Sequence, residues 1–356
     1  MVFLKERVFM KKLAIVGYGG QGAWHAEWAG KSDVVELAGI YDIAEKRAAA
    51  AKDKGIHTYS SIEELVSDPA VDIVLCATPN DVHKDIVITA LNAKKHVICE
   101  KPVALSVGDF DEMVKVAKEN EKILSVHQNR RWDVDFLAIK SLIDSGEIGE
   151  VINIESRIHG SRGIPSDWRC HKPQGGGMIL DWGVHLIDQM LKLIPEKITR
   201  VYCDVTNITT SEVDDGFNLR LTFEDGKSAT VEVGTYNFIA MPRFYMQTKS
   251  GSALIEDWQK KCQVARLKAW NEKDVLPVQT AAGITKTMAP RDELTIDSYE
   301  IERPMSDVHD FYRNYVAAID GKCEQLIKNC EVRRVLLVME AAFKSAELGA
   351  ALNVEI

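Results

Sequence analysis

Short apolar runs alternate with longer helical patterns between residues 13 and 127. The runs contain few polar residues, which is typical of strands covered on both faces of a parallel sheet. The segments between them are long enough for crossover helices. We therefore predict a doubly wound, Rossmann-type parallel sheet. The predicted strands are 13–16, 34–41, 72–77, 96–100 and 123–127, and the predicted helices are 22–30, 44–53, 81–93 and 106–120.

The pattern changes after one further predicted helix at 135–146. Apolar and polar residues now alternate along strands that short turns join directly, and this alternation is typical of an antiparallel sheet with one buried face. We expect an α/β chain with two domains: a parallel-sheet domain over 1–127, and an α+β domain with a large open, mainly antiparallel sheet over 128–356. The predicted strands of the second domain are 151–159, 218–224, 228–236 and 245–250.

Two stretches of the second domain need separate treatment. Residues 256–300 show no clear periodicity, and we predict a loop-rich excursion there. Residues 306–350 are predicted to be helical and to pack back on the first domain. Their apolar positions recur at helical spacing and are Val332, Val335, Leu336, Met339, Phe343 and Ala346.

Composition and charge narrow the possible partners. The net charge of −9 disfavours nucleic acid, because a phosphate backbone would be repelled. No apolar run approaches the ~20 residues that cross a bilayer, and the opening residues 1–12 are too charged for a signal peptide. The seven cysteines form no CxxC pair. We therefore expect a cytoplasmic protein without a membrane partner, a disulfide framework or a zinc cluster.

A glycine-rich turn follows the first predicted strand and opens a helix, with Gly17, Gly19 and Gly22 in GxGxxG spacing. The first glycine permits a tight turn, the second lets a pyrophosphate approach the backbone, and the third lets the helix pack on the strand. Asp42 ends the next strand, where a carboxylate binds the ribose hydroxyls of NAD and repels the 2′-phosphate of NADP. We predict NAD as the cofactor, bound here by Gly17, Tyr18, Gly19, Gly20, Gln21, Gly22 and Asp42.

The preference for NAD is softened by Lys46 and Arg47, which lie just beyond Asp42. Further cofactor contacts are expected after the third and fourth strands, because ligands bind at the carboxyl ends of parallel strands. Pro102 permits a cis peptide, which would fix the direction of the Lys101 side chain. Lys101 is interpreted either as a surface charge at a strand end or as a functional group. The expected contacts are Thr78, Pro79, Asn80, His83, Glu100 and Lys101.

Three glycines lead into an apolar helical pattern at 175–189. Asp181 and His185 are four residues apart, so a helix places them on one face, one turn apart. The pair is compatible with a structural contact and also with catalysis. A histidine accepts protons near neutral pH, and a carboxylate can hold its tautomer or bind a substrate hydroxyl. The pair could also ligate zinc, but no second ligand cluster accompanies it, and we expect no metal.

The order of these motifs resembles the glucose–fructose oxidoreductase / inositol dehydrogenase / rhizopine catabolism (Gfo/Idh/MocA) family. The resemblance rests on the GxGxxG turn with its downstream Asp, ATPNDVH, KHVICEKP, GGGMILDWGVHLID and the tail from VHDFYRNYVAAIDGK onward, and it covers about residues 11–355. Residues 127–151 look most similar to inositol-dehydrogenase-like and glycoside-oxidising members. Lys94 departs from the pattern, because the family usually has glycine there.

The resemblance implies that Lys101, Asp181 and His185 form the catalytic set of an NAD(P)-dependent oxidoreductase acting on CH–OH groups. Hydride would move between nicotinamide and a secondary ring hydroxyl, while the Lys101 ammonium supports the developing alkoxide. The three glycines would let the substrate approach closely. The substrate would be an inositol, a sugar or a glycoside oxidised to a 3-keto product. The tryptophan in 161–174 favours the glycoside. Expected substrate contacts are Asn129, Arg130, Trp168, Arg169, Asp181 and His185.

Two alternatives keep this fold. In one, NAD is recycled during elimination or glycoside cleavage through a transient ketone. In the other, the chain is a non-catalytic NAD-binding sensor, but a sensor needs no proton acceptor such as His185. An open sheet also offers a face for self-association, and we expect a homodimer or homotetramer.

Overall fold

The computed structural model describes residues 10–268 and 275–356. Most of the charged opening stretch, residues 1–9, lies outside the described residues, as do residues 269–274 of the predicted excursion.

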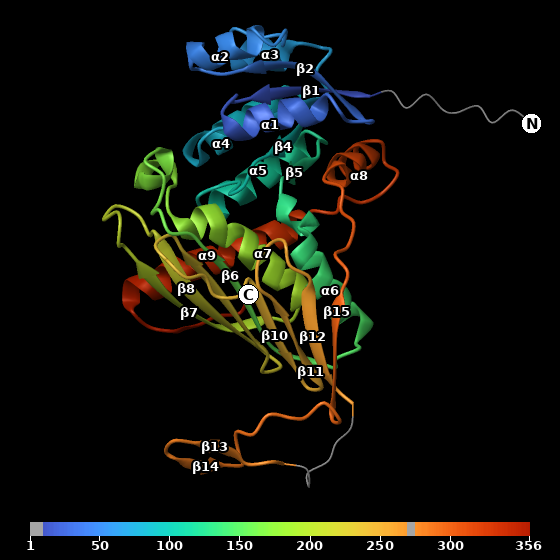
Figure 1. Cartoon of the computed structure of the whole chain (residues 1–356). Helices are drawn as coiled ribbons and strands as arrows, with labels where there is room; N and C mark the ends of the chain where they lie inside the picture. Colours follow the sequence, from blue (N-terminus) through green and yellow to red (C-terminus); the bar gives the residue numbers. More distant parts are fainter. Residues whose placement is uncertain (1–9, 269–274) are drawn as a thin grey trace, which may run out of the picture.

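A five-stranded parallel sheet forms the first half of the chain and confirms the predicted Rossmann-type fold (Figure 1). Its strand order is β2-β1-β3-β4-β5, and every residue of β3 and of β5 is buried, which explains their uninterrupted apolar pattern. The strands are β1 Lys11–Val16, β2 Val35–Tyr41, β3 Ile73–Cys76, β4 His96–Cys99 and β5 Leu124–Val126. The helices are α1 Gly20–Ala29, α2 Glu45–Lys52, α3 Ile62–Ser67, α4 His83–Asn92 and α5 Val107–Glu119.

Helix α3 is absent from the prediction, although its N-terminus carries a local signal. The Ser61 hydroxyl accepts a hydrogen bond from the Glu64 backbone N–H (3.1 Å), and the Glu64 carboxylate accepts one from the Ser60 N–H (2.6 Å). This S-x-x-E pattern is a capping motif. The helix is only six residues long, so it shows too little periodicity to be predicted from hydrophobicity.

A nine-stranded sheet forms the second domain, in the order β15-β12-β11-β10-β6-β9-β8-β7-β16. Its neighbours are antiparallel except β6 and β9, which run parallel, so the predicted open, mainly antiparallel sheet is confirmed. The strands are β6 Val151–His159, β7 Ile198–Thr206, β8 Gly216–Phe223, β9 Ser228–Gly234, β10 Phe244–Thr248, β11 Gly251–Ile255, β12 Cys262–Leu267, β15 Ile296–Ile301 and β16 Leu352–Asn353.

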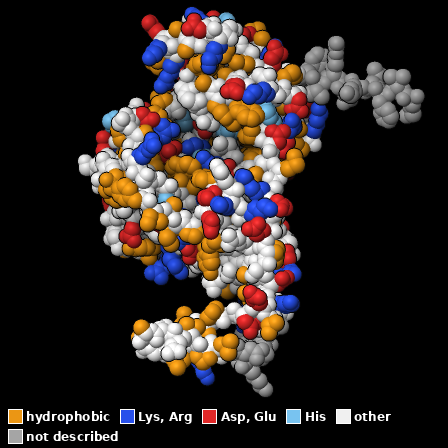
Figure 2. Space-filling model, in the orientation of Figure 1, with side chains coloured by type: hydrophobic (Ala, Val, Ile, Leu, Met, Phe, Trp, Pro, Cys, Tyr) orange, Lys and Arg blue, Asp and Glu red, His pale blue; other side chains and the backbone are white. Residues whose placement is uncertain are grey.

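The prediction of a loop-rich excursion at 256–300 is wrong in part, because β15 is an edge strand of the large sheet and β12 pairs with it and with β11. β15 has no buried residue, so it lacks the apolar alternation that marks a strand. Between them, β13 Val278–Thr280 and β14 Gly283–Thr285 form a hairpin that projects from the body (Figures 1 and 2). Apolar side chains of this segment are 71 to 81% exposed, namely Leu276, Ile284, Met288 and Leu294.

Helices cover one face of the large sheet (Figure 1): α6 Val134–Ser145, α7 Val184–Leu193 and α9 Asn329–Leu348. Four residues of the predicted stripe on α9 are buried, but Phe343 is 39% exposed. Ala342 and Ser345 take its place in the core, because the buried face drifts along a twenty-residue helix. The Ser345 hydroxyl accepts a hydrogen bond from the Cys203 N–H (2.9 Å) and donates one to the Ala350 carbonyl (2.7 Å).

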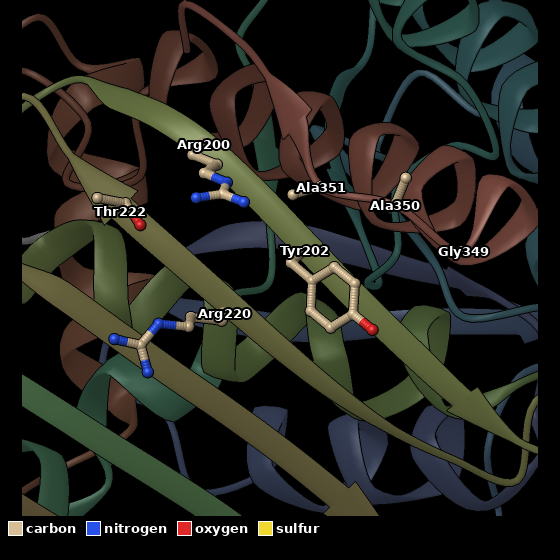
Figure 3. A pocket seen from close by; sticks show the side chains of 7 residues that line it. All are labelled: Arg200, Tyr202, Arg220, Thr222, Gly349, Ala350 and Ala351. Atoms are coloured by element: carbon tan, nitrogen blue, oxygen red, sulfur yellow. The ribbon is translucent and has the colours of Figure 1, made fainter.

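The opposite face of the large sheet carries polar side chains. A depression of about 390 Å³ lies there, and Figure 3 shows the side chains of β7 and β8 and the turn after α9 that line it. None of the residues predicted to bind cofactor or substrate lines this depression. Its lining residues are Arg200, Tyr202, Arg220, Thr222, Gly349, Ala350 and Ala351.

The C-terminal helices also contact the first domain. α8 His309–Ile319 packs there, with the Tyr315 hydroxyl donating to the Ile123 carbonyl (2.9 Å). On α9, the Glu340 carboxylate accepts from the Val107 N–H at the start of α5 (2.8 Å). All seven cysteines are free thiols. Among the described residues, no helix has both the length and the apolar character needed to cross a bilayer.

Candidate active site

The glycine-rich turn has the geometry that its spacing predicts. Gly17 has a φ of 95°, and a Cβ there would lie 2.5 Å from the Ala77 carbonyl oxygen. A Cβ on Gly22 would lie 1.9 Å from the Gly17 oxygen, so the third glycine is needed for helix α1 to pack on β1. Gly19 and Gly20 face open space apart from the Arg47 guanidinium, which lies 3.6 Å from the Gly19 Cβ position. This open side fits a pyrophosphate.

Asp42 lies at the end of β2, directly beside this turn. Its carboxylate accepts hydrogen bonds from the Tyr18 N–H (2.6 Å) and the Ala44 N–H (2.8 Å), and the side chain is 3% exposed. Arg47 Nη1 is 3.5 Å from Asp42 Oδ2. The site therefore combines the fixed Asp42 carboxylate, which favours ribose hydroxyls, with the long, half-exposed Arg47 side chain at its edge.

The loops after β3 and β4 are tied to each other and to the second domain. Both ring nitrogens of His83 contact carbonyls, those of Thr78 and Pro102 (3.0 Å each), and the ring is fully buried. Pro79 precedes the short turn η1 Asn80–Val82, and the Asn80 amide donates to the Gly175 carbonyl (2.8 Å). These contacts hold the two loops in place at the carboxyl edge of the sheet.

Lys101 and Asp181 meet across the two domains, although they are 80 residues apart in the chain. The Lys101–Pro102 peptide is cis, as the sequence allows. Lys101 Nζ donates to Asp181 Oδ1 and to the Asp181 carbonyl, both at 3.1 Å. Arg169 Nε donates to the other carboxylate oxygen at 3.2 Å. Burial alone would raise the pKa of Asp181, but Lys101 and Arg169 outweigh it and hold that pKa below its usual value.

His185 lies near this pair without bonding to Asp181. The segment η5 Ile179–Gly183 is a π-helical turn that leads into α7, so the simple one-turn stacking expected of positions 181 and 185 does not apply. The structure therefore does not show Asp181 holding the tautomer of His185, because both carboxylate oxygens bond to cations instead.

The His185 ring is buried and its Nδ1 has no hydrogen-bond partner within the described chain. Burial, and next the charges of Lys101 and Arg130, hold the pKa of His185 well below its usual value. The ring is thus neutral, and it has a nitrogen available to accept a proton.

The prediction that Gly175, Gly176 and Gly177 make room for substrate is wrong. A Cβ at these positions would lie 2.5 Å from Leu105 Cδ2, 2.2 Å from the Arg169 carbonyl oxygen and 2.3 Å from Asp214 Oδ1, respectively. The glycines let protein segments pack against one another. Asp214, which the sequence did not single out, also accepts a hydrogen bond from the Ile179 N–H (2.7 Å) at the start of η5.

Aromatic rings and guanidinium groups form a wall beside His185. The Arg130 guanidinium lies over Trp182 (4.2 Å to the ring centroid) and Trp258 (5.2 Å). Arg243 also lies over Trp258 (4.9 Å to the ring centroid) and forms a buried ion pair with Asp135 (2.9 Å). Trp258 was missed because it lies in the segment without periodicity, and Arg243 was missed although it directly precedes strand β10. Of the other predicted contacts, Trp168 packs under Arg169 (4.6 Å).

A buried polar network lies behind Lys101. Glu100 Oε1 accepts from His25 Nε2 (2.8 Å) and His127 Nδ1 (2.9 Å), Glu100 Oε2 accepts from the Lys101 N–H (3.1 Å), and Tyr312 contacts the other nitrogen of His25. Burial opposes ionisation of Glu100, but the two histidines lower its pKa well below the usual value. Glu100, predicted to bind cofactor, is therefore an anion that supports the Lys101 backbone.

The His25, Glu100 and His127 group and a second group, Cys76, His83 and Cys99, each bring three possible metal ligands within 4.8 Å. Sequence spacing did not reveal either one. In the first group the ligand atoms bond to one another, and in the second both His83 nitrogens contact carbonyls.

Several buried polar atoms at the end of β5 have no partner in the described chain, and they fit a polar ligand at the seam between the domains. Figure 2 shows histidine side chains along this seam. The unpartnered atoms after β5 are His127 Nε2, both amide atoms of Gln128, Asn129 Oδ1 and Arg130 Nε, and His185 Nδ1 on α7 is a further one.

Comparison with known proteins agrees with this architecture. Residues 11–128 match the family model described as "Oxidoreductase family, NAD-binding Rossmann fold", and residues 136–253 match the "GFO/IDH/MocA C-terminal domain". The structure of an NAD-binding protein from Listeria innocua is 42% identical, covers 97% of this chain and 99% of its own, and superposes with a TM-score of 0.94.

Two curated relatives act on inositols according to their names. A myo-inositol 2-dehydrogenase of Thermotoga maritima is 33% identical over 206 residues, which are 57% of this chain and 60% of that enzyme. The scyllo-inositol 2-dehydrogenase (NADP(+)) IolW of Bacillus subtilis is 30% identical over 256 residues, 70% of this chain and 69% of that enzyme. The chain spans about half the length of other curated relatives that it matches. With a glycine turn built for a dinucleotide and both domains matched, this chain belongs to the Gfo/Idh/MocA family of NAD-binding oxidoreductases.

Proposed function

We propose that this protein oxidises a secondary ring hydroxyl of a polyol or sugar with NAD. The observation that carries the proposal is the meeting of Lys101, Asp181 and His185 at the seam, next to the carboxyl edge of the first sheet. The names of two relatives, which are inositol dehydrogenases, support a polyol or sugar substrate. When bound, NAD supplies the hydride acceptor.

The three side chains divide the remaining work. Lys101 donates a hydrogen bond to the reacting oxygen and stabilises the negative charge that develops there. The neutral His185 ring accepts the hydroxyl proton at its unprotonated nitrogen. Asp181, held ionised by Lys101 and Arg169, accepts a hydrogen bond from a neighbouring substrate hydroxyl. The Arg130–Trp182–Trp258 wall supplies an apolar surface against which a ring packs.

The cofactor preference follows from Asp42, whose carboxylate favours the ribose hydroxyls of NAD over a 2′-phosphate. The predicted contacts of the glycine turn, including Gln21 at the exposed start of α1, belong to this half of the site. The NADP named for the Bacillus subtilis relative makes this preference worth testing directly.

The test is a panel of inositols, hexoses and glucosides incubated with NAD, with NADH followed by absorbance and ketone products by mass spectrometry. We expect stoichiometric NADH and ketone with at least one class. Turnover without net NADH would support the alternative of elimination or glycoside cleavage with recycled NAD. NAD binding without any conversion would support a sensor and contradict the proposal.

Lys101→Met is the matched variant for this panel. It should bind NAD nearly normally, because the phosphate-binding turn is separate, and lose turnover. Near-normal kcat would show that Lys101 is only a strand-end charge.

A further inference from the structure

A cavity of about 470 Å³ opens beside Asp181, at the ends of β6 and β9. Lys101 does not line it; Asp181 stands between the two, with Lys101 on Oδ1 and Arg169 on Oδ2. Its size lies in the range of cavities that hold small-molecule ligands. A ring hydroxyl bound to Asp181 therefore has space on the side away from Lys101.

The lining of this cavity combines apolar surface with bare backbone. Ile158, Met178, Trp182 and Val233 supply the apolar part, and three glycines supply backbone without side chains: Gly160, Gly163 and Gly234. Polar side chains also line the cavity, but His159 contacts Glu232 (3.1 Å) and Thr235 donates to the Asp215 carbonyl (2.6 Å), which leaves Ser161, within the described part of the chain, as the hydroxyl open to a ligand. Such a surface packs against a flat apolar group better than against a hydroxyl-rich ring, which needs hydrogen-bond partners all round.

One cation on the rim is free to contact a ligand. Arg162 lines the cavity and makes no ion pair or hydrogen bond with any described residue, whereas Arg169 is engaged by Asp167 and Asp181. A guanidinium packs on the face of an aromatic ring.

We propose that this cavity holds the aglycone of a glycoside, and that the aglycone is a planar, aryl-type group. The proposal rests on the proposed function, because it assumes that the sugar ring is oxidised at Lys101 and His185. It narrows the substrate class: the preferred substrate is a substituted ring, while free inositols and free hexoses use only part of the site.

Gly160 provides a way to fill the cavity. A Cβ on this residue meets no atom within 4 Å, and its φ is not in the left-handed region. Its backbone is held by hydrogen bonds to Gly234 (2.8 Å) and Asn237 (2.7 Å), which a side chain does not remove. Gly160→Phe should therefore fold and place its ring in the open space. Gly108→Phe, on the exposed surface of α5, is the matched control.

The experiment measures kcat/KM for phenyl glucoside, methyl glucoside, glucose and myo-inositol with NAD. The wild type should prefer phenyl glucoside. Gly160→Phe should lower kcat/KM for phenyl glucoside roughly 10- to 100-fold, the range that pocket contacts contribute. Its kcat/KM for glucose should stay within about twofold of the wild-type value. Arg162→Ala should also lower kcat/KM for phenyl glucoside. Gly108→Phe should change kcat/KM for neither phenyl glucoside nor glucose.

The outcomes separate the two proposals. If no compound in the panel is oxidised, the proposed function fails. If compounds are oxidised but phenyl glucoside has no advantage, or if Gly160→Phe slows glucose and phenyl glucoside equally, the aglycone site is wrong while the oxidoreductase assignment stands. A melting temperature of Gly160→Phe close to that of the wild type shows that the change is local.

Discussion

Replacing Asp181 by asparagine removes a negative charge that lies 3.1 Å from Lys101 Nζ and 3.2 Å from Arg169 Nε. Two unit charges about 3 Å apart attract by about 5 kcal/mol at an effective dielectric constant of ~20. The Lys101 and Asp181 side chains are 17% and 14% exposed, so desolvation and solvent screening both reduce this figure. We expect a net coupling between Lys101 and Asp181 of about 2–3 kcal/mol, the upper range for residues in contact.

The assay is a double-mutant cycle on kcat/KM with Lys101→Met, Asp181→Asn and the double variant. Each single change should be slow, by roughly 10²–10⁴-fold. If the two losses were independent, they would multiply. The kcat/KM of the double variant should be roughly 30- to 160-fold higher than that product predicts, which is the coupling energy expressed as a ratio. Asp181→Asn combined with His185→Asn should come much closer to multiplicative losses, because no hydrogen bond joins these two side chains in the described structure.

The pH profile gives a second readout. Burial, and next the charge of Lys101, lower the pKa of His185. Removing that charge in Lys101→Met should raise the pKa of His185 and move the acidic limb of kcat/KM to higher pH. NAD affinity, measured by titration, is the control and should hardly change. Multiplicative losses for Lys101 with Asp181, together with strong coupling of Asp181 with His185, would refute the reasoning and restore the contact suggested by the sequence spacing.

Three further outcomes follow from the structure. Gly177→Ala should lower the free energy of unfolding in urea by about 2–4 kcal/mol, because its φ of 105° and the 2.3 Å distance from a Cβ to Asp214 leave no room for a side chain. Gly108→Ala is the control. If Gly177→Ala were as stable as the wild type, this packing would be contradicted. In binding titrations, Asp42→Ser should reduce the ratio of the NADP Kd to the NAD Kd at least tenfold, while Arg47→Ala should increase this ratio. An unchanged ratio in both variants would contradict the role given to Asp42. Burial, and next the charge of His127, lower the pKa of His25 to about 4. As the pH is lowered below ~6.5, this histidine is protonated in the unfolded chain before it is protonated in the folded chain. The free energy of unfolding therefore decreases as the pH decreases, by about 3 kcal/mol at pH 4 from this group. His25→Gln should flatten that part of the stability curve between pH 6.5 and 4, and an unchanged slope would show that His25 is protonated in the fold.

The strands and helices of the first domain were predictable because each carries its own signal. β1, β3 and β4 are buried on both faces, so they appear as apolar runs, and Gly22 of the turn is required by a contact within a few residues, the Gly17 carbonyl. Lys94 shows a limit of such local reading. Its φ of 63° is the conformation that explains why the family usually has glycine there, yet the lysine side chain gives no hint of it.

Edge strands carried a weaker signal. β15 is an edge strand of the large sheet and buries no residue, so the alternation that identified β6 and β9 is missing from it. Of the six residues predicted for the buried face of α9, four are buried and Ala346 is half-buried, whereas Phe343 is exposed because the buried face drifts away from it. In both places the environment, and not the residue's own preference, decides burial.

The sequence by itself determined the dinucleotide turn, the fold class and the residue types of the candidate site. Only the tertiary structure decided which of these residues are partners. Asp181 bonds to Lys101, 80 positions away, and not to His185, four positions away, because a π-helical turn changes the local register and the domains close on the pair. The same holds for Trp258 beside Trp182, for Asp214 against Gly177, and for Tyr312 on His25, 287 residues distant. The hydrophobic pattern of a sequence predicts which side chains are buried, but long-range packing determines which residues those side chains contact.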